Sequence, residues 1–169
     1  LKLTIEYFNF EHNATRRQAV DLFIIGFSSL YPNILTGSYN YIDYFINKLG
    51  QNISSSEYKS ISHVLAEICC NFRIDINAQI QILKFVFKKW KSTNDLELID
   101  ESLCLLKQLD IMDIFSNNYN SLLNFYSSIF GFYVKNVELK RSVLLFISST
   151  MNDELFLMCY KHLFKCIVN

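Results

Sequence analysis

The side chains best suited to acid–base or metal chemistry are the three histidines, His12, His63 and His162. None has the His-x-x-x-His or Glu-x-x-His spacing that presents two metal ligands on one helical face. We expect His12 to be structural or solvated, and His63 and His162 to be partly buried neutral imidazoles. An enzyme would need a polar cleft that gathers His63 or His162 with carboxylates of strongly shifted pKa. The sequence predicts no catalytic residue, no metal site and no cofactor.

The five cysteines are odd in number and lack Cys-x-x-Cys spacing: Cys69, Cys70, Cys104, Cys159 and Cys166. They indicate neither a disulfide framework nor a zinc site. Cys69 and His63 are close in sequence, but six helical residues place them about 9 Å apart along the axis, pointing different ways. We expect free, mostly buried thiols in a reducing compartment.

The densest basic feature is a stripe of Lys84, Lys88 and Lys91, whose steps of four and three place them on one helical face. Such a stripe could contact an acidic partner or a phosphate backbone, and it is also typical of the solvated side of an amphipathic helix. Arg16 and Arg17 open a predicted helix, where positive charge opposes the helix dipole by roughly a few tenths of a kcal/mol. This placement indicates a compensating carboxylate from another helix or a partner. These five residues are the predicted partner-binding site.

Other polar clusters have simpler explanations. Asp95, Glu97, Asp100 and Glu101 begin a predicted helix, where acidic side chains favour the positive end of the helix dipole. The four glycines lie too far apart to form a phosphate-binding loop.

Composition favours one all-helical domain covering residues 1–169. Hydrophobic residues make up 51% and charged residues 19%, which argues against disorder. Only four Gly and one Pro occur, so long segments run without breakers, as in helices joined by short polar loops. Sixteen basic and sixteen acidic residues cancel, which counts against nucleic-acid binding. Because the chain does not start with Met, we expect it to be a piece of a longer polypeptide.

Apolar residues recur at helical spacing in eight segments, and the first places Ala19, Phe23, Phe27 and Leu30 on one face. Asn13 or Thr15, Ser54–Ser56 and Asp95 are suited to cap helix starts. The longest uncharged stretch, 22–42, contains too many polar residues to span a membrane. We predict helices over about residues 14–31, 35–49, 57–72, 77–91, 96–106, 122–134, 138–149 and 153–167, with a short turn over 110–115.

The helices contain an internal repeat. Residues 17–24 (RQAVDLFI) align without a gap on residues 140–147 (KRSVLLFI), and weaker echoes lie at 59–65 and 100–106. The offset of 123 residues corresponds to three periods of about 41, the length of a HEAT-type repeat with two helices. We therefore predict antiparallel helical hairpins stacked as a HEAT-like α-solenoid of about eight helices.

The segment 13–23 (NATRRQAVDLF) resembles a stretch in the importin-β superfamily, and is closest to the exporter that recycles importin-α, the cellular apoptosis susceptibility family. In that family a Thr-Arg-Arg triplet opens a HEAT helix, and a Lys-bearing helix follows at about the interval of Lys59 here. The resemblance extends from Asn13 to Lys59. It implies a Ran- and cargo-binding transport receptor, of which this chain is one internal stretch, and it assigns no binding residue.

The leading functional hypothesis is a non-enzymatic scaffold that binds protein partners through a helix-lined surface, in the cytoplasm or nucleus and within a larger complex. The alternative is a compact helical bundle, a regulatory factor that receives a partner helix in a groove. Regular hairpins that contact only their neighbours favour the first hypothesis, whereas a central helix wrapped by others favours the second.

Overall fold

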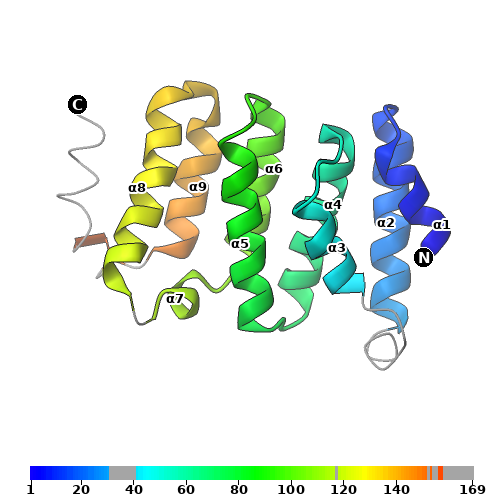
Figure 1. Cartoon of the computed structure of the whole chain (residues 1–169), viewed down its shortest axis with the longest axis horizontal. Coiled ribbons are helices and arrows are strands. Elements are labelled where there is room, and N and C mark those ends of the chain that lie inside the picture. The colour runs from blue at the N-terminus through cyan, green and yellow to red at the C-terminus, as the bar shows by residue number, and fades with distance from the viewer. Residues whose placement is uncertain (31–40, 117, 152, 154–155, 158–169) are drawn as a thin grey trace. The chain divides into compact units, whose positions relative to one another are not determined.

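The computed structural model describes residues 1–30, 41–116, 118–151, 153 and 156–157 (Figure 1). All regular structure in these residues is helical, which confirms the predicted all-α class. The chain divides into two compact units, Leu1–Gln108 and Leu109–Asn169. No helix in the described part of the chain is long and apolar enough to cross a membrane.

The first unit contains six α-helices and one 3₁₀ helix within its described residues: α1 (Lys2–Ile5), η1 (Glu6–Asn9), α2 (Asn13–Leu30), α3 (Tyr41–Leu49), α4 (Ser55–Asn71), α5 (Ile76–Trp90) and α6 (Leu96–Lys107). In the described part of the second unit, the elements are α7 (Ile111–Ile114), α8 (Tyr119–Lys135), η2 (Val137–Leu139) and α9 (Lys140–Thr150). The predicted second helix begins among residues outside the described range, and most of the predicted eighth helix also falls there.

Short polar side chains start the central helices of the first unit. The side chain of Ser54 accepts a hydrogen bond from the amide of Glu57, and that of Asp95 from the amide of Leu98. Both caps were predicted, because such side chains satisfy amides that the first helical turn leaves free. At α2 the prediction was wrong: the ring of His12 lies 3.4 Å from the amide nitrogen of Thr15, while Asn13 accepts from Arg16.

In the first unit, α2, α4 and α6 form one layer, with α4 packed between the other two (Figure 1). On the other side of this layer, α3 packs against α4 and α5, and α5 against α6. Helix η1 packs against both α2 and α4. This arrangement leaves one face of the α2–α4–α6 layer open to solvent, and the candidate site lies there.

An aromatic cluster fixes the start of this layer. The rings of Phe23 and Phe45 lie 5.1 Å apart between centroids, and both rings lie 6.0 Å from that of Phe8. All three side chains are almost fully buried. Phe23 was predicted to be in the core, whereas Phe8 belongs to η1, which the sequence did not predict. Leu30 was predicted on the same apolar face and is 47% exposed instead, because it ends the last turn of α2.

The second unit has its own core. In it, α8 packs against α9 and η2. The rings of Phe125 and Phe146 meet at 5.9 Å, and the hydroxyl of Tyr126 donates to the carbonyl of Thr150 at the end of α9. These contacts hold α8 and α9 together as a helical pair.

Candidate functional site

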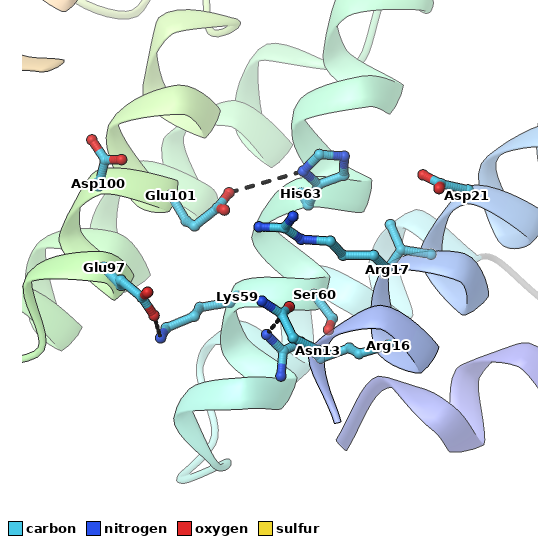
Figure 2. Close-up of a pocket in the computed structure, with 11 residues that line it drawn as sticks. Asn13, Arg16, Arg17, Asp21, Lys59, Ser60, His63, Glu97, Asp100 and Glu101 are labelled. Atoms are coloured by element: carbon cyan, nitrogen blue, oxygen red, sulfur yellow. Dashed lines mark hydrogen bonds and ion pairs between the residues drawn. The ribbon is translucent and has the colours of Figure 1, made fainter. Parts of the chain in front are cut away.

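A charged groove of about 440 Å³ crosses the open face of α2, α4 and α6 (Figure 2). Its size falls in the range of about 300–1,000 Å³ that is usual for ligand pockets. Each helix contributes residues at steps of one, three or four, the spacing of a single helical face. The lining residues are Asn13, Arg16, Arg17, Val20 and Asp21 of α2, Lys59, Ser60 and His63 of α4, and Glu97, Asp100 and Glu101 of α6.

Lys59 links the central helix, α4, to α6 in the groove. Its Nζ lies 2.5 Å from a carboxylate oxygen of Glu97 and 3.5 Å from one of Asp95. The ion pair with Lys59 lowers the pKa of Glu97. Burial acts to raise the pKa of Asp95, but the hydrogen bond from Leu98 and the charge of Lys59 together lower it. Lys59 is mostly buried, so it acts as a structural cation that holds two helices together.

His63 and Glu101 form a second link one turn further along. The imidazole Nδ1 lies 3.9 Å from Glu101 Oε2, and His63 keeps 48% of its side chain exposed. The nearby carboxylate of Glu101 raises the pKa of His63, partial burial lowers it, and the charges of Glu67 and Asp21 add to the rise. The half-exposed ring fits the predicted partial burial, and an acid from another helix favours the charged form over the predicted neutral one.

The two predicted arginines both line this groove. Arg16 donates to the carbonyl of Phe10 at 3.2 Å and to Asn13 Oδ1 at 2.9 Å, and its charge helps to lower the pKa of Glu97. The side chain of Arg17 extends from α2 toward α4 (Figure 2) and makes no hydrogen bond or ion pair with the described residues. The sequence indicated that a carboxylate from another helix compensates this pair, and Glu97 fits that role for Arg16.

The predicted lysine stripe lies elsewhere. Lys84 and Lys88 are exposed on α5, and the exposed Lys91 caps its end; α5 belongs to the opposite side of the unit from the groove. Lys88 and Lys89 occupy the last turn of α5, where positive charge complements the helix dipole. Lys89 also lies over the ring of Tyr58 at 5.5 Å. The structure thus separates the five predicted binding residues into two surfaces.

The acidic cluster at the start of α6 was predicted to serve only the helix dipole. That prediction missed the main contacts of these residues. Glu97 and Glu101 pair with Lys59 and His63, which precede them by 38 residues in the chain. One signal was available: Arg17, Lys59 and Asp100 begin aligned copies of the predicted repeat, and all three line the groove. Equivalent repeat positions therefore pointed to a shared surface.

The groove brings His63 together with carboxylates, which is part of what an acid–base enzyme needs. The hydroxyl of Ser60, one turn before His63, donates to the carbonyls of Phe8 and Ser56 at 3.0 Å and is buried. The described residues contain no group of three or more His, Cys, Asp or Glu able to hold a metal ion. The groove is therefore lined by paired charges and by a Ser60 hydroxyl that is already hydrogen-bonded to the backbone. Such a lining is suited to binding polar groups.

The described thiols lie away from the groove. Cys70 and Cys104 are exposed, so the expectation of buried thiols is wrong for these two positions, whereas Cys69 is partly buried. Burial raises the pKa of the Cys69 thiol to about 12. Cys159, Cys166 and His162 lie outside the described residues.

Comparisons of the chain with protein-family models, with curated proteins and with solved structures give no match.

Proposed function

We propose that this chain is a protein-binding helical scaffold, and that an extended segment of a partner protein lies in the groove across α2, α4 and α6. One observation carries the proposal: a groove lined by ten polar or charged side chains crosses three helices of one layer. Because adjacent helix axes lie about 8–10 Å apart, such a groove suits a chain that crosses the helices. Its four acidic residues stand beside three Lys or Arg residues, so the groove is not the positively charged surface that nucleic acids bind.

The repeat supports a HEAT-like arrangement of stacked hairpins. The fourth position of each aligned segment is buried in all four copies, at Val20, Ser62, Leu103 and Val143. The seventh position is buried as well, at Phe23, Leu65, Leu106 and Phe146. A shared burial pattern is expected when each hairpin covers the apolar face of its neighbour. We propose that this stacking, an α-solenoid, creates the surface on which partners bind.

The resemblance of residues 13–23 to the importin-β superfamily extends the proposal to nuclear transport, with the chain working in the cytoplasm or nucleus as part of a larger complex. Arg16 and Arg17, which carry that resemblance, line the groove. A direct test is binding of the purified chain to Ran loaded with GTP or GDP. A preference for the GTP form supports the transport assignment, and equal or absent binding removes it while leaving the scaffold proposal in place.

We favour binding over catalysis because polar groups of the groove already have hydrogen-bond or ion-pair partners. The hydroxyl of Ser60 donates a hydrogen bond to backbone carbonyls, and Lys59 is paired with two carboxylates. General acid–base catalysis depends on a group that can transfer its proton to a substrate. His63 is the exposed titratable group that comes closest to this requirement.

A second surface favours the alternative of a partner helix held in a hollow. In the second unit, Leu144 and Leu145 of α9 are 47% and 52% exposed and line an open hollow with Lys140 and Arg141. An amphipathic helix with acidic flanks fits this surface, because it would cover the leucines and pair with the two cations. Leu144→Asp would abolish binding of such a helix.

The scaffold proposal is tested by capturing partners from a cell extract with the full chain and with single charge reversals. Arg17→Glu lies in the groove, and Arg73→Glu is a matched control because Arg73 is exposed and does not line it. A partner that the wild type and Arg73→Glu retain, and Arg17→Glu loses, supports the groove. Partners retained by all three proteins would overturn it.

A further inference from the structure

The first and fourth copies of the repeat expose an apolar position that the two inner copies bury. At the sixth position of the aligned segments, Val64 of α4 and Leu105 of α6 are completely buried. The equivalent Leu22 of α2 and Leu145 of α9 are 60% and 52% exposed. Burial of a leucine changes an affinity by about tenfold or more. The exposed apolar surfaces of α2 and α9 therefore favour contact with another molecule.

On α9 this surface is the open hollow described above, which we call the α9 hollow. Leu144 and Leu145 supply its apolar part, and each is about half exposed. Its charged lining consists, among the described residues, of the cations Lys140 and Arg141 and the acid Glu138. Because two bases stand beside one acid, the hollow suits an apolar segment that carries acidic side chains.

The first eleven residues contain such a segment. Leu3, Tyr7 and Phe10 follow one another at steps of four and three, and they are 73%, 43% and 45% exposed. The rings of Tyr7 and Phe10 meet at 4.8 Å between centroids, with their planes 64° apart. These three side chains form an apolar stripe on α1, η1 and the residue that follows η1.

The charges of this segment are opposite to those of the α9 hollow. Glu6 and Glu11 are exposed beside the apolar stripe, and Lys2 is the exposed base among residues 2–11. Arg16 reaches the segment from α2, where it donates to the carbonyl of Phe10, and its side chain lines the groove. Two acids thus accompany one base in the segment, whereas two bases accompany one acid in the hollow. The five residues that define the N-terminal surface are Leu3, Glu6, Tyr7, Phe10 and Glu11.

We propose that a second copy of this chain fills the α9 hollow with its N-terminal surface. The apolar stripe of one copy then covers the two leucines of the next, and its two acids meet the two cations. Because the two surfaces differ, the contact is heterologous, and it adds copies in a row or a ring. The inference rests on the second surface of the proposed function, whose occupant it identifies, and it is independent of the groove.

Sedimentation equilibrium of the full chain tests this contact, and we expect the average mass to rise with concentration. One double variant, Glu6→Lys with Glu11→Lys, gives the N-terminal surface the charge of the hollow. The other, Lys140→Glu with Arg141→Glu, gives the hollow the charge of the N-terminal surface. Each double variant alone should associate about tenfold more weakly than wild type or less, because like charges then meet. An equimolar mixture of the two should recover association, because each surface again meets a hollow of opposite charge.

Arg73→Glu is the matched control, because Arg73 is exposed and belongs to neither surface, and it should associate like wild type. An average mass that stays at that of the monomer up to about 1 mM would overturn the inference. Association that both double variants retain, or a mixture that does not recover it, would overturn it as well. Circular dichroism checks that the helices of each variant are intact.

Failure of this inference is distinguishable from failure of the proposed function. The groove would still stand if Arg17→Glu loses a captured partner that Arg73→Glu retains. A monomeric wild type whose captured partner is lost in Leu144→Asp would show that the hollow holds a different protein, and would overturn the second copy as its occupant.

Discussion

The imidazole of His63 lies 3.9 Å from the carboxylate of Glu101, and this contact joins α4 to α6 along the wall of the groove. The surrounding charges strengthen it: Glu67 lies on the same helix, and Asp21 reaches the groove from α2. These three acids favour the charged form of His63.

We predict that His63 titrates with a pKa above its ordinary value of 6.5, and that Glu101→Gln lowers this pKa. The contact with the Glu101 carboxylate is the largest cause of the rise, so Glu67→Gln should lower the pKa of His63 less. NMR titration of the imidazole protons measures both changes. A pKa of His63 that Glu101→Gln leaves unchanged would show that the pair does not form in solution.

The same pair makes stability depend on pH. A group whose pKa is higher in the folded than in the unfolded state stabilises the fold below its unfolded pKa, and this contribution is lost as the pH rises through the folded pKa. Wild type should therefore exceed Glu101→Gln in melting temperature most clearly below pH 6.5, with the difference shrinking above it. A difference that grows with pH would contradict the assignment.

Two replacements of Asp95, by alanine and by asparagine, distinguish its role as a helix cap from the role of its charge. Asp95→Ala removes the side-chain acceptor for the Leu98 amide and should cost about 1 kcal/mol in the free energy of unfolding, whereas Asp95→Asn keeps a good cap. Because Asp95 also pairs with Lys59, Asp95→Asn should still cost slightly more than Asp75→Asn, since Asp75 caps α5 without an ion pair to the described residues. Urea unfolding measures all three. Equal losses for Asp95→Ala and Asp95→Asn would contradict the capping role.

Two phenylalanines at equivalent repeat positions should anchor their units. Phe23→Ala and Phe146→Ala each leave a cavity in a buried site and should cost about 3–5 kcal/mol. Their neighbours Leu22 and Leu145 are 60% and 52% exposed, so alanine there should change stability by at most about 0.5 kcal/mol. Chemical unfolding compares each pair. A loss under about 1 kcal/mol for either phenylalanine would mean that its core contacts are wrong.

Apolar periodicity correctly predicted the positions of most helices in the first unit. The predicted helices over 57–72, 77–91 and 96–106 match α4, α5 and α6 to within two residues at each end. Helix η1 was missed because one buried aromatic, Phe8, holds a four-residue element that is too short to show a period. Arg16 and Arg17 were found through their unfavourable place at a helix start. Glu101 was missed because its partner, His63, belongs to another helix, and sequence spacing does not report that distance.

The lysine stripe remains a separate prediction. Charge reversal at Lys84, Lys88 and Lys91 should leave the fold intact, because all three side chains are exposed, and should weaken any partner held by α5. Captured partners are compared between this triple variant and wild type, with circular dichroism as the control for folding. An unchanged set of partners would remove the stripe from the binding surface.

The thiols of the adjacent residues Cys69 and Cys70 should differ in reactivity. Burial raises the pKa of Cys69 to about 12, which leaves little thiolate near neutral pH, whereas Cys70 is exposed. Iodoacetamide should label Cys70 well before Cys69, as read by peptide mass spectrometry over time. Equal rates in the folded chain, or faster labelling of Cys69, would contradict the burial of that thiol.

The most direct measurement is amide chemical-shift mapping of the isotope-labelled chain, titrated with the partner segment that capture identifies. If the groove is the binding surface, the largest shifts fall in residues 13–21, 59–63 and 97–101, and Arg17→Glu abolishes them. Shifts that spare these three segments and concentrate on residues 84–91 or 140–148 would contradict the account.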